Sequence, residues 1–82
     1  MLGTPSRFLS VHEFDTFLLD GQRINVTYAA GGEILECRIE NSQFVIPSSL
    51  FKIYLRNRLI EKVARHQFAV TPLGQARLKR RA

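Results

Sequence analysis

The first regular pattern of apolar residues along the chain has the spacing of an α-helix. Four apolar residues recur every three or four positions and form one stripe: Val11, Phe14, Phe17 and Leu18. Ser10 stands just before this stripe and Glu13 three residues later, which is the pattern of a capping box. A helix is therefore expected to begin after Ser10 and to end at Asp20-Gly21, where glycine suits the left-handed position after a helix.

From Arg23 the period of the apolar residues changes from 3.6 to 2. Apolar and polar residues alternate over 23–28 and again over 35–40, on either side of Ala30-Gly31-Gly32. This pattern predicts a β-hairpin with one buried face. The second strand would bury Leu35, Cys37 and Ile39. Residues 44–46 add a short third strand that Pro47 ends, because proline has no amide hydrogen to donate.

The second half of the chain repeats the change between helical and strand spacing. A helix is expected over 49–57, capped by Ser48 or Ser49. Its inner face would hold Leu50, Phe51, Tyr54 and Leu55, and its outer face Ser49, Lys52, Ile53 and Arg56. Strands over 59–64 and 67–71 follow, joined by a turn at Arg65-His66. Thr71-Pro72 has the chemistry of a helix start and predicts a last helix over 72–80.

These elements predict one α+β domain. The order is α-β-β-(β)-α-β-β-α. A chain of 82 residues makes one domain. We place that domain at 10–80, after a flexible arm over 1–9, and the sequence contains no internal repeat or linker.

Composition restricts the compartment. The chain has one cysteine, Cys37, whereas small secreted domains usually have several in pairs. Its first residues do not have the pattern of a signal peptide, and no apolar run approaches the ~20 residues of a membrane helix. These features predict a cytoplasmic protein without a membrane partner.

Charge is divided unequally between the two halves of the chain. The net charge is +5, but residues 1–48 have three arginines against six carboxylates, and residues 49–82 have nine cations against Glu61 alone. The cations of the second half are Lys52, Arg56, Arg58, Lys62, Arg65, Arg77, Lys79, Arg80 and Arg81. This asymmetry indicates an anionic partner for the second half. The alternative is a solvated surface with a basic tail.

The residues do not indicate catalysis or a bound cofactor. The candidate metal ligands are Cys37, His12 and His66, and they form no short-range pair such as a structural zinc site needs. Cys37 alternates in phase with apolar residues, which predicts a buried thiol with no base beside it. We therefore expect no enzyme, no metal and no cofactor.

Two segments of the second half resemble the C-terminal half of bacterial winged helix-turn-helix domains. The segment "RNRLIEKV" is similar to the end of a recognition helix and the first strand of the wing. The segment "QFAVTPLGQARL" is similar to the returning strand and the final helix. The matching residues are Leu59, Ile60, Glu61, Phe68, Val70, Thr71, Pro72, Leu73 and Gly74. This resemblance implies a winged-helix-like fold, from which the first half departs by having a β-hairpin in place of the second helix. It also implies that the helix before the wing contacts DNA and that Arg65 and His66 lie at the wing tip.

The whole-chain layout resembles the small bacterial YjhX-type toxin family. The resemblance rests on "DGQRINV", "GGEILEC", "LFKIYLRNRLIEKV" and the closing threonine-glycine turn. That family is associated with toxin–antitoxin pairs and with inhibition of a DNA topoisomerase, so the resemblance implies a protein partner.

Two functions are therefore expected from the sequence. The first is a small bacterial DNA-binding protein or transcription regulator, in which a homodimer would provide two half-sites. Its DNA-contacting residues would be Ser49, Lys52, Arg56, Arg58, Lys62, Arg65, His66, Arg77, Lys79, Arg80 and Arg81. The alternative is a protein-interaction module, or a toxin-type inhibitor of a nucleic-acid enzyme, with Ile53 at the interface.

Overall fold

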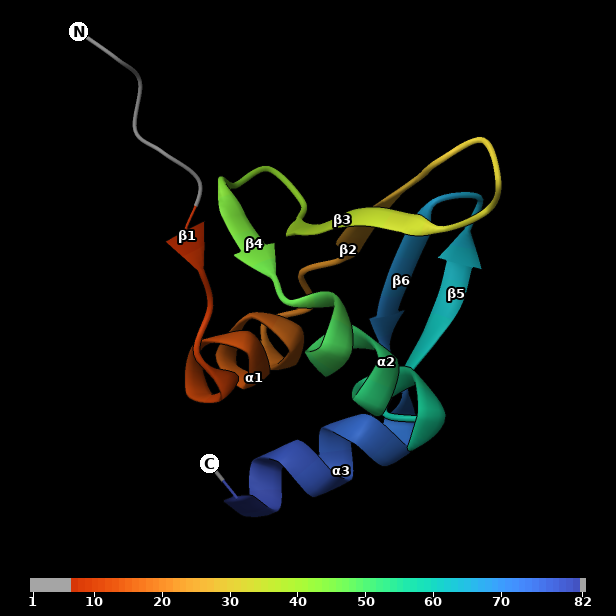
Figure 1. The fold of residues 1–82 in the computed structure, drawn as a ribbon. Coiled ribbons are helices and arrows are strands. Elements are labelled where there is room, and N and C mark those ends of the chain that lie inside the picture. The colour runs from red at the N-terminus through yellow and green to blue at the C-terminus, as the bar shows by residue number, and fades with distance from the viewer. Residues whose placement is uncertain (1–6, 82) are drawn as a thin grey trace, which may run out of the picture.

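The computed structural model describes residues 7–81. Its elements, in chain order, are β1 (Arg7–Phe8), α1 (Val11–Leu19), β2 (Ile24–Tyr28), β3 (Ile34–Ile39), β4 (Phe44–Ile46), α2 (Ser48–Arg56), β5 (Ile60–Ala64), β6 (Gln67–Val70) and α3 (Pro72–Arg81). Figure 1 shows the three helices gathered on one side of the strands, with the turns of both hairpins at the end away from the helices. The predicted α+β class is confirmed, and the order of elements is loosely compatible with a winged helix.

The strands form one six-stranded sheet in the order β1-β4-β3-β2-β6-β5. Neighbouring strands are antiparallel except β1 and β4, which pair in parallel. β2 lies at the centre, where Val26 pairs with Cys37 of β3 and Ile24 pairs with Phe68 of β6. The two hairpins, from the two halves of the chain, are thus joined into a single sheet through β2.

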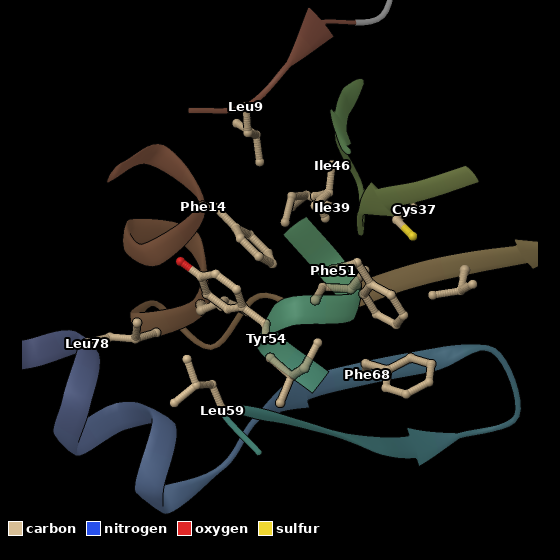
Figure 2. Packing of buried hydrophobic residues seen from close by; sticks show 14 residues of the cluster. Leu9, Phe14, Cys37, Ile39, Ile46, Phe51, Tyr54, Leu59, Phe68 and Leu78 are labelled. Carbon is tan, nitrogen blue, oxygen red and sulfur yellow. The ribbon is translucent and has the colours of Figure 1, made fainter. Parts of the chain in front are cut away.

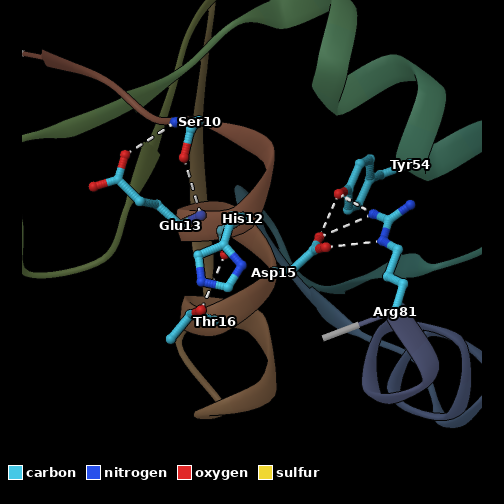
Figure 3. A network of polar contacts seen from close by, with 7 residues as sticks. All are labelled: Ser10, His12, Glu13, Asp15, Thr16, Tyr54 and Arg81. Atoms are coloured by element: carbon cyan, nitrogen blue, oxygen red, sulfur yellow. Dashed lines mark hydrogen bonds and ion pairs between the residues drawn. The ribbon is translucent and has the colours of Figure 1, made fainter.

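The helix starts follow local chemistry at two of the three expected positions. Glu13 N–H donates to Ser10 Oγ at 3.2 Å and Ser10 N–H donates to Glu13 Oε1 at 3.1 Å, so the capping box is confirmed (Figure 3). Thr71 Oγ1 accepts a hydrogen bond from Gly74 N–H at 2.9 Å and caps α3. The predicted N-cap of α2 was wrong. The N-cap residue is Pro47, which makes no side-chain hydrogen bond, and Ser48 and Ser49 are already part of the helix.

The core lies between the helices and the sheet. Phe14 and Leu18 of α1, Phe51 of α2 and Leu78 of α3 are buried against the inner side of the strands (Figure 2). Burying one such side chain contributes about 1.5–3 kcal/mol to stability. The paired aromatic rings Phe14–Tyr54, 4.6 Å apart, and Phe51–Phe68, 4.9 Å apart, join α1 to α2 and α2 to β6. These contacts determine which side of α2 faces outward.

Three apolar residues that the spacing placed in the core are exposed. Val11 is the first residue of α1, Leu35 the second residue of β3, and Leu55 the last but one of α2. Leu35 is 65% exposed and Leu55 39% exposed. Val11 and Leu55 lie at the ends of their helices, and Leu35 lies at an irregularity of the β2–β3 pairing, where strict alternation no longer predicts which side chains are buried.

The expected flexible arm over 1–9 is wrong for its last residues. β1 pairs with β4, Leu9 is buried, and Leu9 N–H donates to the carbonyl of Val45 at 2.9 Å. The partner strand lies more than thirty residues further along the chain, so no local pattern predicts the pairing. Residues 1–6 of the expected arm lie outside the described residues.

Gly74 allows α3 to approach the segment between α2 and β5. A Cβ atom at this position would lie 2.1 Å from the carbonyl oxygen of Leu59 and 2.9 Å from Val70 Cγ2. A backbone atom cannot move aside as the end of a flexible side chain can. The glycine of the predicted Thr-Pro-Leu-Gly helix start is therefore required by packing.

Candidate nucleic-acid interface

The outer side of α2 is the centre of the candidate interface. Phe51 and Tyr54 anchor the inner side of the helix in the core, with exposed fractions of 1% and 2%. Residues three and four positions apart share one side of a helix. Ser49, Lys52 and Arg56 are accordingly exposed together on the outer side, as the spacing predicted.

Ile53 lies among these polar residues and is 48% exposed. Leu55, the residue before Arg56, is also partly exposed. The outer side of α2 therefore combines two cations with two large apolar side chains, and it has no carboxylate, because α2 contains no acidic residue.

Two further cations lie beside the C-terminal end of α2. Arg58 adopts φ +60° where the chain leaves α2, and its carbonyl accepts a hydrogen bond from Thr71 Oγ1 at 2.7 Å. Lys62 of β5 pairs directly with Phe68 of β6, so both side chains lie on the side of the sheet that α2 covers. We call the exposed set Lys52, Arg56, Arg58 and Lys62 the basic face.

Carboxylates of the sheet lie on its other side. Glu61 pairs with Ala69, and both point away from the helices. Gln67 Nε2 donates to Glu40 Oε2 at 2.7 Å and to Asn25 Oδ1 at 3.0 Å. Arg38 donates two hydrogen bonds to Glu36, at 3.1 and 3.0 Å. The carboxylates of Glu36 and Glu40 thus have polar partners. The ion pairs of the described residues include none with a side chain of the basic face.

Arg65 and His66 form the turn of the β5–β6 hairpin, as predicted. The ring of His66 lies 5.7 Å from that of Tyr28, and its carbonyl accepts a hydrogen bond from Val26 N–H at 2.8 Å. Two residues make a short turn, so little backbone extends beyond the strands. This tip lies away from the helices, next to the loop of the first hairpin (Figure 1).

The four predicted cations of α3 are in two different situations. Arg77, Lys79 and Arg80 are exposed. Arg81 instead binds Asp15 of α1 through Nε at 2.9 Å and Nη2 at 3.0 Å, and the Tyr54 hydroxyl donates to the same carboxylate (Figure 3). We call Asp15, Tyr54 and Arg81 the helix clasp, because one residue comes from each helix. Burial and the bond to Asp15 raise the pKa of Tyr54, which keeps its hydroxyl a donor.

The helix clasp was not found by reading the sequence. Asp15 is only 6% exposed, and it occurs between Phe14 and Phe17 on the buried side of α1. A carboxylate among apolar helix positions suggests a buried partner, but that partner, Arg81, is 66 residues away. The structure therefore gives Arg81 a role within the fold.

The described residues contain no evident centre for metal or nucleophilic chemistry. Within 7–81, no three His, Cys, Asp or Glu side chains gather to hold a metal ion. Burial raises the pKa of the Cys37 thiol from 9.0 to about 11, with a smaller effect from Glu36, so the thiol is protonated at neutral pH. No helix of the described segment has the length and hydropathy of a membrane span.

No protein-family model, curated protein or solved structure matches this chain.

Proposed function

We propose that this protein is a small DNA-binding regulator that contacts the phosphate backbone through its basic face. One observation supports this most: four exposed cations lie on α2, in the turn after it and on the helical side of β5, while Glu61 of β5 points to the other side and Glu36 of β3 is bound by Arg38. Lysine and arginine contacts with phosphates provide most of the affinity of non-specific DNA binding.

An α-helix such as α2 fits the major groove of DNA. A helix with its side chains is about 10–12 Å in diameter, and the groove is about 12 Å wide. In this arrangement Lys52 would contact phosphate, Arg56 would contact phosphate or a guanine edge, and Ser49 would add a hydrogen bond.

Two features favour backbone contact over reading of bases. α2 follows strand β4 directly through Pro47, so the element before it in the chain is a strand and not the first helix of a helix-turn-helix unit. The turn at Arg65-His66 is also too short to extend far along the duplex. We expect modest affinity from one copy, and a homodimer would be needed to contact two half-sites.

The test is fluorescence anisotropy of a labelled random duplex, titrated with the protein between about 50 and 200 mM salt. Binding is expected to weaken steeply with salt, and the double variant Lys52→Ala, Arg56→Ala should reduce it at every salt concentration. The matched control is Arg23→Ala, which removes an exposed cation whose Nη1 bonds Gln67 on the opposite side of the sheet. No binding at low salt, or equal losses from the control, would contradict the proposal.

The second candidate function is a protein-interaction module, and the exposure of Ile53 and Leu55 favours it. In that case the basic face meets an acidic protein surface around an apolar centre. A pull-down with Ile53→Asp distinguishes the two functions. If Ile53→Asp abolishes capture of a protein partner whose binding depends only mildly on salt, the interaction module is supported. If only lysine and arginine variants lower the affinity, and they do so for DNA, the regulator is supported.

A further inference from the structure

A surface hollow of about 420 Å³ lies next to the first turn of α2. Its lining is mixed, with the polar residues Glu36, Ser48 and Ser49 beside Cys37 and the apolar residues Phe8, Leu35, Val45, Ile46 and Pro47. Phe8 is 67% exposed and Leu35 65% exposed. Large apolar side chains that are exposed around a concavity are typical of a binding surface.

The hollow lies where the regular pairing of β3 with its neighbours ends, since β4 pairs with β3 only as far as Cys37. Leu35 lies at an irregularity of the β2–β3 pairing, because Thr27 pairs with Glu36 and Tyr28 with Ile34. Cys37 is covered and Leu35 is not. β1, with two residues, closes only part of the gap at the edge of the sheet. The open side therefore exposes apolar groups that the fold itself does not bury.

The charges around the hollow favour an acidic partner. Glu36 is on the lining, but its carboxylate is bound by Arg38 at 3.0 Å. Lys52 lies near enough to Cys37 to oppose the rise in the pKa of that thiol, and it has no carboxylate partner among the described ion pairs. Ser49 lines the hollow, and Ile53 and Arg56 lie one and two turns further along the same side of α2.

We propose that the hollow binds an apolar anchor side chain from a segment of another protein, whose neighbouring acidic residues pair with Lys52 and Arg56. The exposed side chains of Phe8 and Leu35 offer no hydrogen bond to a phosphate, so they fit an apolar side chain better than DNA. A second copy of this chain is disfavoured, because it would bring another protein of net charge +5 against Lys52.

The partner segment would also regulate DNA binding, and this step rests on the proposed function. Lys52 and Arg56 belong to the basic face, so a segment seated in the hollow covers two of its four cations. Bound partner and bound DNA are therefore expected to exclude each other.

The test is selection from a random-peptide library on the immobilised full-length protein. We expect enriched peptides to contain a large apolar residue with Asp or Glu nearby. Leu35→Asp and Lys52→Glu should each weaken a selected peptide by at least roughly tenfold, which corresponds to about 1.4 kcal/mol. The matched control for Leu35→Asp is Leu73→Asp, an exposed apolar position on α3, which should leave the affinity unchanged.

Four outcomes would overturn the proposal. The first is enrichment without an excess of acidic residues, and the second is binding that Leu35→Asp does not change. The third is amide-shift mapping that places the chain's own residues 1–6 in the hollow. The fourth is loss of DNA affinity in Leu35→Asp, which would assign the hollow to the nucleic-acid surface.

The peptide and DNA results separate the two proposals. A peptide that binds through Leu35 supports the docking site even if the protein does not bind DNA. Peptide binding without DNA binding would contradict the proposed DNA function and leave the docking site standing. A peptide that binds through Leu35 without displacing DNA supports docking and overturns mutual exclusion.

Discussion

Arg56 and Arg81 are the last residues of α2 and α3, and both belong to the basic half of the chain. The structure uses them differently. Arg81 binds the nearly buried Asp15 and contacts the Tyr54 hydroxyl, whereas Arg56 is exposed and belongs to the basic face. A count of cations treats the two alike.

The difference shows that the partner of a charge determines its role. Asp15 needs a cation because a buried carboxylate without one is strongly destabilising. Arg56 has no such carboxylate beside it, so its charge remains available to another molecule. The helix clasp should therefore affect stability, and the basic face should affect binding.

The largest expected effect comes from Phe51→Ala, because Phe51 anchors α2, which contributes residues to both the helix clasp and the basic face. Phe51 is buried and packs edge-on against Phe68, so the substitution should lower the free energy of unfolding by about 3–5 kcal/mol. Urea denaturation measures this loss. Ile53→Ala, on the exposed side of the same helix, is the control and should change stability by less than about 0.5 kcal/mol. Equal midpoints for the two variants would contradict the placement of the core.

Arg81→Ala should have the next largest effect, on stability and not on binding. The substitution leaves the Asp15 carboxylate bonded to the Tyr54 hydroxyl but without its cation. Because Arg81 is half exposed, we expect the free energy of unfolding to fall by only about 1–3 kcal/mol. Thermal unfolding of Arg81→Ala and of Arg56→Ala compares the effect of the two arginines on the unfolding temperature. If the two variants unfold at the same temperature, the helix clasp does not distinguish the arginines.

Cys37 gives a smaller effect that depends on pH. Its folded pKa of about 11 lies above the ordinary 9.0, so between these values the unfolded thiol loses its proton while the folded thiol retains it. Stability should therefore fall as pH rises from 9 towards 11, with a contribution from Cys37 of about 1–2 kcal/mol. Urea melts at several alkaline pH values test this. Cys37→Ala should flatten part of the decline, and the raised pKa of Tyr54 leaves a remainder at higher pH.

Arg56→Ala should have the smallest effect on stability, within about 0.5 kcal/mol, because the side chain is exposed. Its effect should appear in DNA binding, where losing one phosphate contact lowers the slope of log affinity against log salt by about one. Anisotropy titrations measure this slope. An unchanged slope would remove Arg56 from the proposed contact surface.

Local chemistry predicted most of the fold. The capping box at Ser10, the alternation over β2 and β3, and the cap at Thr71 each involve neighbouring residues, and each was confirmed. The outer side of α2 also followed from helical spacing. Long-range partners were not predictable in this way. They are the pairing of β1 with β4, the bond between Asp15 and Arg81, and the irregular pairing of β2 with β3 beside Leu35.

The central position of β2 has a consequence for how the chain folds during its synthesis. One neighbour of β2 is β3, which is made soon after it, and the other is β6, which ends at Val70. Until β6 has left the ribosome, β2 has an unpaired edge. Such late pairing slows folding and exposes a strand edge to other nascent chains. The N-terminal half is therefore expected to require either the rest of the chain or a chaperone to remain unaggregated.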